Sequence, residues 1–163
     1  MSGAGSPRPT LVFGEALVDD FNAEQIVGGA PFNVARHLAA FMAPVVTITR
    51  IGNDRSGQLV RAEFERFAMS EAGLQIDPLE ETGRVLVERG PRGHRFTILP
   101  NQAYDFIERA AALHSAQQAD PGIVYFGMLA QRHETARSAL KAVLEASAGK
   151  TARFLDLNLR EGQ

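Results

Sequence analysis

The sequence contains no cysteine, which excludes disulfide bonds, thiolate metal sites and cysteine nucleophiles. It also has no excess of basic residues, because 17 Lys and Arg stand against 19 Asp and Glu, for a formal net charge of −2. Binding to a nucleic-acid backbone or to an anionic membrane surface is therefore not expected. The four histidines never occur at i and i+4, so a pair of zinc ligands on one helix is excluded as well.

No apolar run is long enough to cross a bilayer, since the longest covers only residues 38–46. The N-terminal segment lacks the apolar stretch of a signal peptide, and residues 1–9 are predicted to form a disordered tail. These absences favour a soluble, cytoplasmic protein. The length of 163 residues and the apolar content of 45% fit one globular domain with a sizeable core, here expected over residues 10–163.

Short apolar runs alternate with segments of helical periodicity along the chain. Strands are expected at residues 10–14, 45–51, 123–127 and 153–157, and helices at 31–42, 54–73, 107–114 and 134–147. In the first of these helices Pro31 suits the first turn, and one apolar stripe comprises Phe32, Ala35, Ala39 and Met42 before Pro44 ends the helix. Asp54 or Ser56 is placed to cap the second helix. The alternation predicts an α/β fold, a mainly parallel sheet flanked by helices.

Two segments interrupt this alternation. Residues 19–27 form a polar link, and residues 84–99 read as a hairpin around Gly90-Pro91-Arg92-Gly93, in which proline and glycine suit the second and fourth positions of a type I turn. Neither segment belongs to a strand–helix–strand unit. We interpret them as excursions that form a small β flap, or lid, over one edge of the sheet.

Polar residues are expected to gather beyond the carboxyl ends of the strands, where open parallel sheets bind ligands. These residues are Asp19, Asp20, Asn33, Asp156, Asn158 and Arg160. Carboxylates and amides side by side suit the paired donors and acceptors of a sugar, and Gly28-Gly29 before a helix allows a ligand to approach the backbone. From the residues alone, Asp19 could instead cap a turn, and residues 156–160 could be the ordinary polar residues that follow a strand.

Several motifs, in their order and spacing along the chain, resemble those of a known family. Gly28-Gly-Ala-Pro-Phe-Asn33-Val-Ala35, followed by Ile51-Gly-Asn-Asp54-Arg-Ser-Gly57, resembles the first signature of the ribokinase-like (PfkB) carbohydrate kinases. Residues 13–19 and 156–160 are similar to the fructokinase branch of that family. The resemblance implies a ribokinase-like fold and transfer of phosphate from ATP to a sugar hydroxyl. For the complete enzyme it implies ATP and Mg²⁺, and a lid that closes over the sugar.

The resemblance also implies roles for individual residues. It assigns substrate binding to Asp19, Gly28, Gly29, Asn33, Asn101 and Asn158, and a place near the transferred phosphate to Arg160. In some relatives the lid pairs two subunits, so a homodimer through the lid remains an open alternative. Leu99 and Gln102 stand roughly where the family pattern carries an arginine and a serine, which leaves the identity of the sugar open.

The elements expected to bind ATP are missing from the sequence. It contains neither a Gly-x-x-x-x-Gly-Lys-Ser/Thr loop nor the Gly-Ala-Gly-Asp turn that supplies the anion hole and the base in this family. We therefore expect an incomplete C-terminal half, no catalytic residue and no metal site in this chain, no tight binding of ATP, and no kinase turnover by the chain alone.

Several alternatives remain open at this point. One is a kinase for 2-keto-3-deoxygluconate, ribose or a nucleoside, and another is a non-catalytic sugar-binding or regulatory remnant. A dinucleotide-binding domain is disfavoured because no Gly-x-Gly-x-x-Gly turn follows the first strand.

Overall fold

A computed structural model describes residues 7–90 and 93–158 of the chain. Its central sheet has the order β5-β4-β1-β8-β9, and every pair of neighbouring strands is parallel. The strands are β1 (Thr10–Phe13), β4 (Val45–Gly52), β5 (Leu74–Asp77), β8 (Ile123–Gly127) and β9 (Ala152–Asp156). The predicted α/β fold with a mainly parallel sheet is confirmed.

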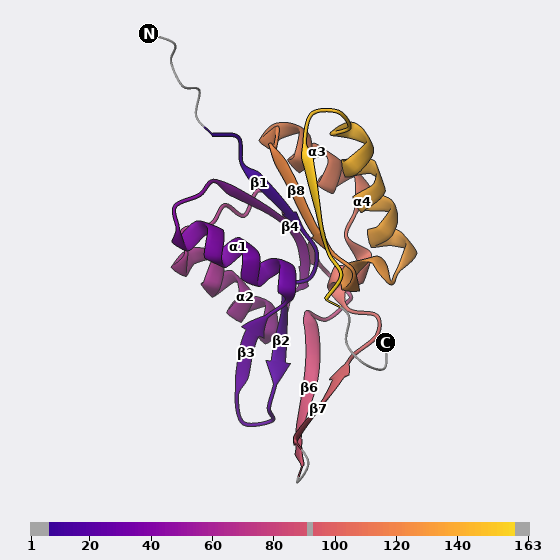
Figure 1. Ribbon diagram of the computed structural model, residues 1–163. Coiled ribbons are helices and arrows are strands. Elements are labelled where there is room, and N and C mark those ends of the chain that lie inside the picture. The colour runs from indigo at the N-terminus through magenta and orange to yellow at the C-terminus, as the bar shows by residue number, and fades with distance from the viewer. Residues whose placement is uncertain (1–6, 91–92, 159–163) are drawn as a thin grey trace.

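Helices cover both faces of the central sheet (Figure 1). On one face lie α1 (Ala30–Ala40) and α2 (Arg55–Arg66), and on the other lie α3 (Arg109–Ala119) and α4 (Glu134–Ala146). Two short 3₁₀ helices, η1 (Ala103–Phe106) and η2 (Leu129–Gln131), precede α3 and α4.

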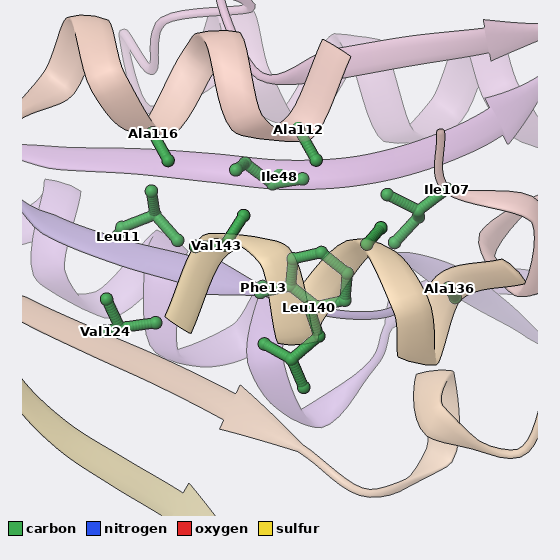
Figure 2. Packing of buried hydrophobic residues seen from close by; sticks show 11 residues of the cluster. Leu11, Phe13, Ile48, Ile107, Ala112, Ala116, Val124, Ala136, Leu140 and Val143 are labelled. Atoms are coloured by element: carbon green, nitrogen blue, oxygen red, sulfur yellow. The ribbon is translucent and has the colours of Figure 1, made fainter. Parts of the chain in front are cut away.

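The apolar side chains of β1 alternate between two cores, because successive residues of a strand point to opposite faces. Leu11 and Phe13 pack against α3 and α4, together with Ile48, Val124 and Leu140 (Figure 2). Val12 packs on the other face with α1 and α2. A strand that is buried on both faces has no polar alternation, which explains the continuous apolar run of its sequence.

A second, smaller sheet has the order β3-β2-β6-β7 and projects from one end of the central sheet (Figure 1). It consists of β2 (Leu17–Asp20), β3 (Gln25–Gly28), β6 (Gly83–Gly90) and β7 (Gly93–Ile98), and we call it the small sheet. The β2–β3 and β6–β7 pairs are antiparallel, whereas β2 and β6 pair in parallel. The predicted hairpin is therefore present, although Pro91 and Arg92 at its turn lie outside the described residues.

The first two helices end earlier than predicted. The α1 helix ends at Ala40, with Phe41 as C-cap, and Met42 adopts a left-handed φ of 56° with 93% of its surface exposed. Met42 is thus not part of the apolar stripe, because the chain has left the helix before reaching it. The α2 helix ends at Arg66 instead of near Gly73, and the strand β5 that follows was not predicted.

Two other predictions differ in detail from the structure. The α3 helix begins at Arg109 and runs to Ala119, five residues beyond the predicted end at residue 114, and the separate turn η1 precedes it. Residues 1–6 of the predicted N-terminal tail lie outside the described residues, whereas Arg8 forms an ion pair of 3.0 Å with Asp120.

Asp54 connects the start of α2 to the start of β6. Its Oδ1 accepts hydrogen bonds from the Gly57 amide (2.7 Å) and the Thr82 hydroxyl (2.8 Å), and its Oδ2 accepts one from the Thr82 amide (2.7 Å). This side chain is therefore both the predicted helix cap and a link between two distant segments.

We expect Asp54→Ala to lower the free energy of unfolding by about 2–3 kcal/mol, because it removes a helix cap, leaves the Thr82 amide without its acceptor and removes the shorter of the two hydrogen bonds donated by the Thr82 hydroxyl. Asp54→Asn retains one acceptor oxygen, so a smaller loss is expected from this matched control. Urea denaturation measures both values. An equal loss for the two variants would contradict the contribution assigned to the oxygen that asparagine retains.

Candidate functional site

The two sheets meet at the link formed by residues 14–16, which joins β1 to β2. A Cβ atom at Gly14 would lie 2.5 Å from Cγ of Pro31, in the first turn of α1. A Cβ atom at Gly29 would lie 2.5 Å from the carbonyl oxygen of Glu15. The link and the start of α1 are thus in direct backbone contact, at the carboxyl end of β1.

Asp19 lies inside β2 and not in a loop after the first strand, as the sequence had suggested. Its Oδ2 is 3.2 Å from the position that a Cβ atom of Gly28 would occupy, so the carboxylate lies over the glycine pair. Asp20 is the next residue along the strand and points to the opposite face, where it accepts a hydrogen bond from Gln25 (3.2 Å). Of the two aspartates, the structure brings only Asp19 to the glycine turn.

Asp19 also belongs to one cross-strand row of the small sheet. The strand register places it opposite Ile26 and Val85, and Val85 opposite Ile98. Directly opposed residues share one face of a sheet, so a carboxylate is flanked by apolar side chains along this row. Such a surface suits a ligand with hydroxyl groups and C–H faces.

Gly29 precedes the first residue of α1 and has a φ of 104°, a conformation that side chains other than glycine rarely adopt. Its carbonyl accepts a hydrogen bond of 2.8 Å from the Asn33 amide. The Asn33 side chain lies in the same turn, and its Oδ1 accepts a hydrogen bond from Arg36. Arg36 also donates to the carbonyl of Val27 (3.0 Å), so it ties Asn33 to the small sheet. The structure thus gathers Asp19, Gly28, Gly29 and Asn33 around one turn.

A second polar group lies at the end of β9. The hydroxyl of Tyr125 donates a hydrogen bond of 2.6 Å to Oδ2 of Asp156, and Oδ1 of that residue accepts from the Asn158 amide at 3.0 Å. Burial and the neighbouring carboxylate both raise the pKa of Tyr125. Asn158 is exposed with a left-handed φ of 37°, and Arg160 lies outside the described residues.

Asn101 is exposed in the turn after β7, with a φ of 51°. Its backbone carbonyl accepts a hydrogen bond of 3.3 Å from the side chain of the next residue, Gln102, which is a local contact. The carbonyl of Leu99, in the same segment, accepts a hydrogen bond of 2.7 Å from Arg132. A cation therefore contacts the segment in which the family resemblance had led us to expect an arginine.

Sequence reasoning missed a buried charged cluster beneath the small sheet. Arg132 donates to both carboxylate oxygens of Asp105 (2.8 and 2.7 Å), and its guanidinium lies 5.1 Å from the centre of the Tyr104 ring. Asp105 is only 1% exposed, so the carboxylate of this bidentate ion pair is shielded from water. The partners are 27 residues apart in sequence, and no local pattern connects them.

Glu15 is the other missed residue. It is 4% exposed, and its Oε2 makes no hydrogen bond within the part of the chain that the structure describes. Burial raises the pKa of the Glu15 carboxyl from 4.5 to about 7, although the amides of Ala30 and Ala130 and the charge of Arg132 oppose the shift. A glutamate within the otherwise apolar run of residues 11–18 was the signal that could have revealed it.

The described part of the chain contains neither a candidate metal centre nor a candidate membrane span. Over residues 7–90 and 93–158, no three His, Cys, Asp or Glu side chains converge in a way that could hold an ion. Over the same residues, no helix is both long and apolar enough to traverse a bilayer.

Comparison with known proteins reveals clear relatives. The sequence pattern of the pfkB family carbohydrate kinases matches residues 8–160. A putative sugar kinase from Pyrococcus horikoshii is 25% identical over 147 residues, which cover 84% of this chain and 44% of the relative. A fructokinase from Vibrio alginolyticus is 26% identical over 157 residues, which cover 92% and 50%. The chain thus spans about half the length of the curated relatives it matches.

Solved structures show the same fold. The crystal structure of the Pyrococcus horikoshii sugar kinase has a TM-score of 0.83 at 24% identity, and the match covers 93% of this chain and 53% of that one. A Vibrio cholerae fructokinase with bound fructose, ADP and calcium has a TM-score of 0.75 at 24% identity, with 94% and 51% covered. At these identities the likeness establishes the fold.

We expect Gly29→Ala to destabilise the chain by about 2–4 kcal/mol, because it combines a left-handed φ with a direct clash against the Glu15 carbonyl. Gly149→Ala is the matched control, since Gly149 also has a positive φ (71°) but faces open space. The control isolates the conformational strain, for which about 1 kcal/mol is expected. Thermal or urea denaturation measures the free energy of unfolding of both variants. Equal losses for Gly29→Ala and Gly149→Ala would contradict the close packing at Gly29.

The buried carboxyl of Glu15 predicts a pH dependence of stability. Its pKa is higher in the folded state than in the unfolded state, so the folded state binds more protons between about 4.5 and 7. Stability from this group is therefore greatest below pH 4.5, falls as the pH rises, and levels off above about pH 7.

Because glutamine cannot ionise, Glu15→Gln should lack this loss of stability. Between pH 5 and pH 8 we expect the stability of Glu15→Gln to rise by roughly 2–3 kcal/mol relative to that of the unmodified chain. Urea denaturation at the two pH values measures this difference. A constant difference would show that Glu15 is ionised in the folded state at both.

Proposed function

Because this chain belongs to the pfkB family of carbohydrate kinases, we propose that it provides the sugar-binding part of a fructokinase-like kinase. The observation that carries the proposal is the placement of Asp19, Gly28, Gly29 and Asn33 around one turn at the junction of the two sheets. The fructokinases among the relatives support fructose as the first sugar to test.

In this proposal the residues of the turn divide the recognition of the sugar between them. The Asp19 carboxylate accepts hydrogen bonds from sugar hydroxyls, and the absence of side chains at Gly28 and Gly29 lets the sugar approach the backbone. Asn33 offers an amide whose oxygen is held by Arg36. The apolar neighbours of Asp19 in the small sheet cover the C–H face of the sugar ring.

The small sheet takes the part of a lid over the sugar. Both lid segments expected from the sequence, about 19–27 and 84–99, fall largely within its strands. It joins the rest of the chain through the link at residues 14–16 and the glycine turn, so movement of the sheet would change the space above Gly29. A homodimer through this lid is the accompanying alternative, since Ile26 and Phe96 are about half exposed on it.

The described residues do not fit ATP and Mg²⁺. They contain no cluster of metal ligands, and the sequence has no phosphate-binding loop. We therefore propose that ATP and Mg²⁺ are bound by a part of the enzyme that lies outside this chain. Exposed apolar side chains at the open edge of the central sheet (Phe154, Leu155 and Leu157) support a neighbour on that side.

Sugar binding is tested most directly at the two adjacent aspartates. Asp19→Ala should weaken fructose binding by about tenfold or more, because the loss of a charged hydrogen-bond acceptor removes about 1.5 kcal/mol or more. Asp20→Ala should leave the affinity nearly unchanged, since Asp20 points to the other face of the same strand. Isothermal titration calorimetry with fructose compares the two, and equal effects would contradict the proposed site.

The chain alone should show no ATP-dependent phosphorylation of fructose, ribose or 2-keto-3-deoxygluconate. The physical reason is that the sequence has neither a phosphate-binding loop nor the Gly-Ala-Gly-Asp turn that would supply the anion hole and the base. A coupled assay for ADP release measures turnover, with a full-length fructokinase as positive control. Sustained turnover by pure chain would overturn the division of roles, whereas binding without turnover agrees equally with a non-catalytic sugar-binding protein.

A further inference from the structure

Glu15 occupies the point where the central sheet, the small sheet and α1 meet. Its backbone lies in the link between β1 and β2, and its carbonyl contacts Gly29 so closely that no side chain would fit there. Its side chain is buried, and Oε2 has no hydrogen-bond partner among the described residues. The sugar-binding role proposed above does not use this carboxyl group.

The start of α1 lacks the usual stabilising groups for a helix N-terminus. Gly29 has no side chain with which to cap it, and the first turn contains no acidic residue. The Glu15 carboxyl group lies beside the first turn of this helix, because a Cβ atom at Gly127 would lie 4.0 Å from Oε2 of Glu15 and 3.2 Å from Cγ of Pro31. The backbone N–H of Ala30, the first residue of the helix, lowers the pKa of the Glu15 carboxyl group and so favours its charged form. A negative charge at this position is favoured by the partial positive charge of the helix N-terminus.

The surroundings of Glu15 both oppose and favour its ionisation, and burial outweighs the groups that favour the charged form. Burial disfavours the charged form, whereas the Ala30 and Ala130 amides and Arg132 favour it, and the result is a pKa of about 7. The titratable and charged groups around it are Arg132 after η2, Tyr104 on η1 and Tyr125 on β8, with Asp105 and Asp156 bonded to the first and the last of these. Within residues 7–90 and 93–158, the buried hydroxyl of Tyr104 also makes no hydrogen bond.

We propose that Glu15 is a positioning residue for the sugar site, whose ionised carboxylate holds the Gly28-Gly29 turn and the start of α1 in the conformation that receives the sugar. Glu15 does not touch the sugar itself. It acts through the Ala30 amide and through its backbone contact with Gly29. The affinity for sugar therefore rises as Glu15 loses its proton around neutral pH. This inference rests on the proposed function, but its first test does not require a sugar.

The first test follows the backbone amides of Gly29, Ala30 and Asn33 by ¹⁵N-resolved NMR between pH 5.5 and pH 8.5. In the unmodified chain these amide shifts should titrate together with one midpoint near 7. In Glu15→Gln the titration should be lost, and in the matched control Glu24→Gln it should persist, because Glu24 is exposed between β2 and β3. Amide shifts that do not titrate, or that still titrate in Glu15→Gln, would overturn the proposal.

The second test measures the fructose affinity by calorimetry over the same pH range. The affinity of the unmodified chain should fall by about three- to tenfold on acidification, the range expected for a charge at a helix N-terminus. Glu15→Gln should show the weaker affinity at every pH. A merely structural role would alter the affinity without removing its pH dependence.

The two tests distinguish failure of this inference from failure of the proposed function. If fructose does not bind at any pH while the amides titrate through Glu15, the positioning of the turn stands and the choice of sugar is wrong. If fructose binds with an affinity that is independent of pH, sugar binding stands and the role of Glu15 is wrong.

Discussion

The close approach between the link at residues 14–16 and the first turn of α1 determines how the two sheets are joined. Two glycines, Gly14 and Gly29, face atoms of the opposite segment at distances that exclude any side chain. The chain leaves the central sheet for the small sheet on one side of this contact and returns into α1 on the other. The position of Asp19 relative to Gly28, and thus the candidate site, depends on this backbone contact.

The sequence was sufficient to predict most of the central sheet and its helices, because strands such as β1 contain an apolar run (residues 11–13) and helices such as α4 have clear periodicity. It did not predict β5, because this strand has only four residues and two of them are polar. It did not predict the end of α1 either, because the turn there depends on the left-handed backbone conformation of Met42. The Arg132–Asp105 pair could not be predicted, since only tertiary structure brings its members together. The glycine turn was predictable because two adjacent glycines precede a proline.

Burial of the Glu15 carboxyl group, where the two sheets meet, lowers the stability of the chain but places a charge beside the start of α1. An apolar residue at position 15 would avoid the desolvation of a carboxylate, and the chain would gain stability at neutral pH. The carboxyl group is nevertheless placed beside a helix start that has no cap of its own. Loss of stability next to a binding site is a recurrent feature of proteins that need a particular local conformation for function. The junction of the two sheets fits that pattern.

The parallel pairing of β2 with β6 has a consequence for the order of folding. Hairpin strands can pair as soon as both have left the ribosome, but a parallel pair of distant strands must wait for the chain between them. Here that chain contains α1, β4, α2 and β5, which form one flank of the central sheet. During synthesis the β2–β3 hairpin therefore has an unpaired edge at β2 until β6 has been made. In folding followed by hydrogen exchange, the amides of β2 that face β6 should be among the last to become protected.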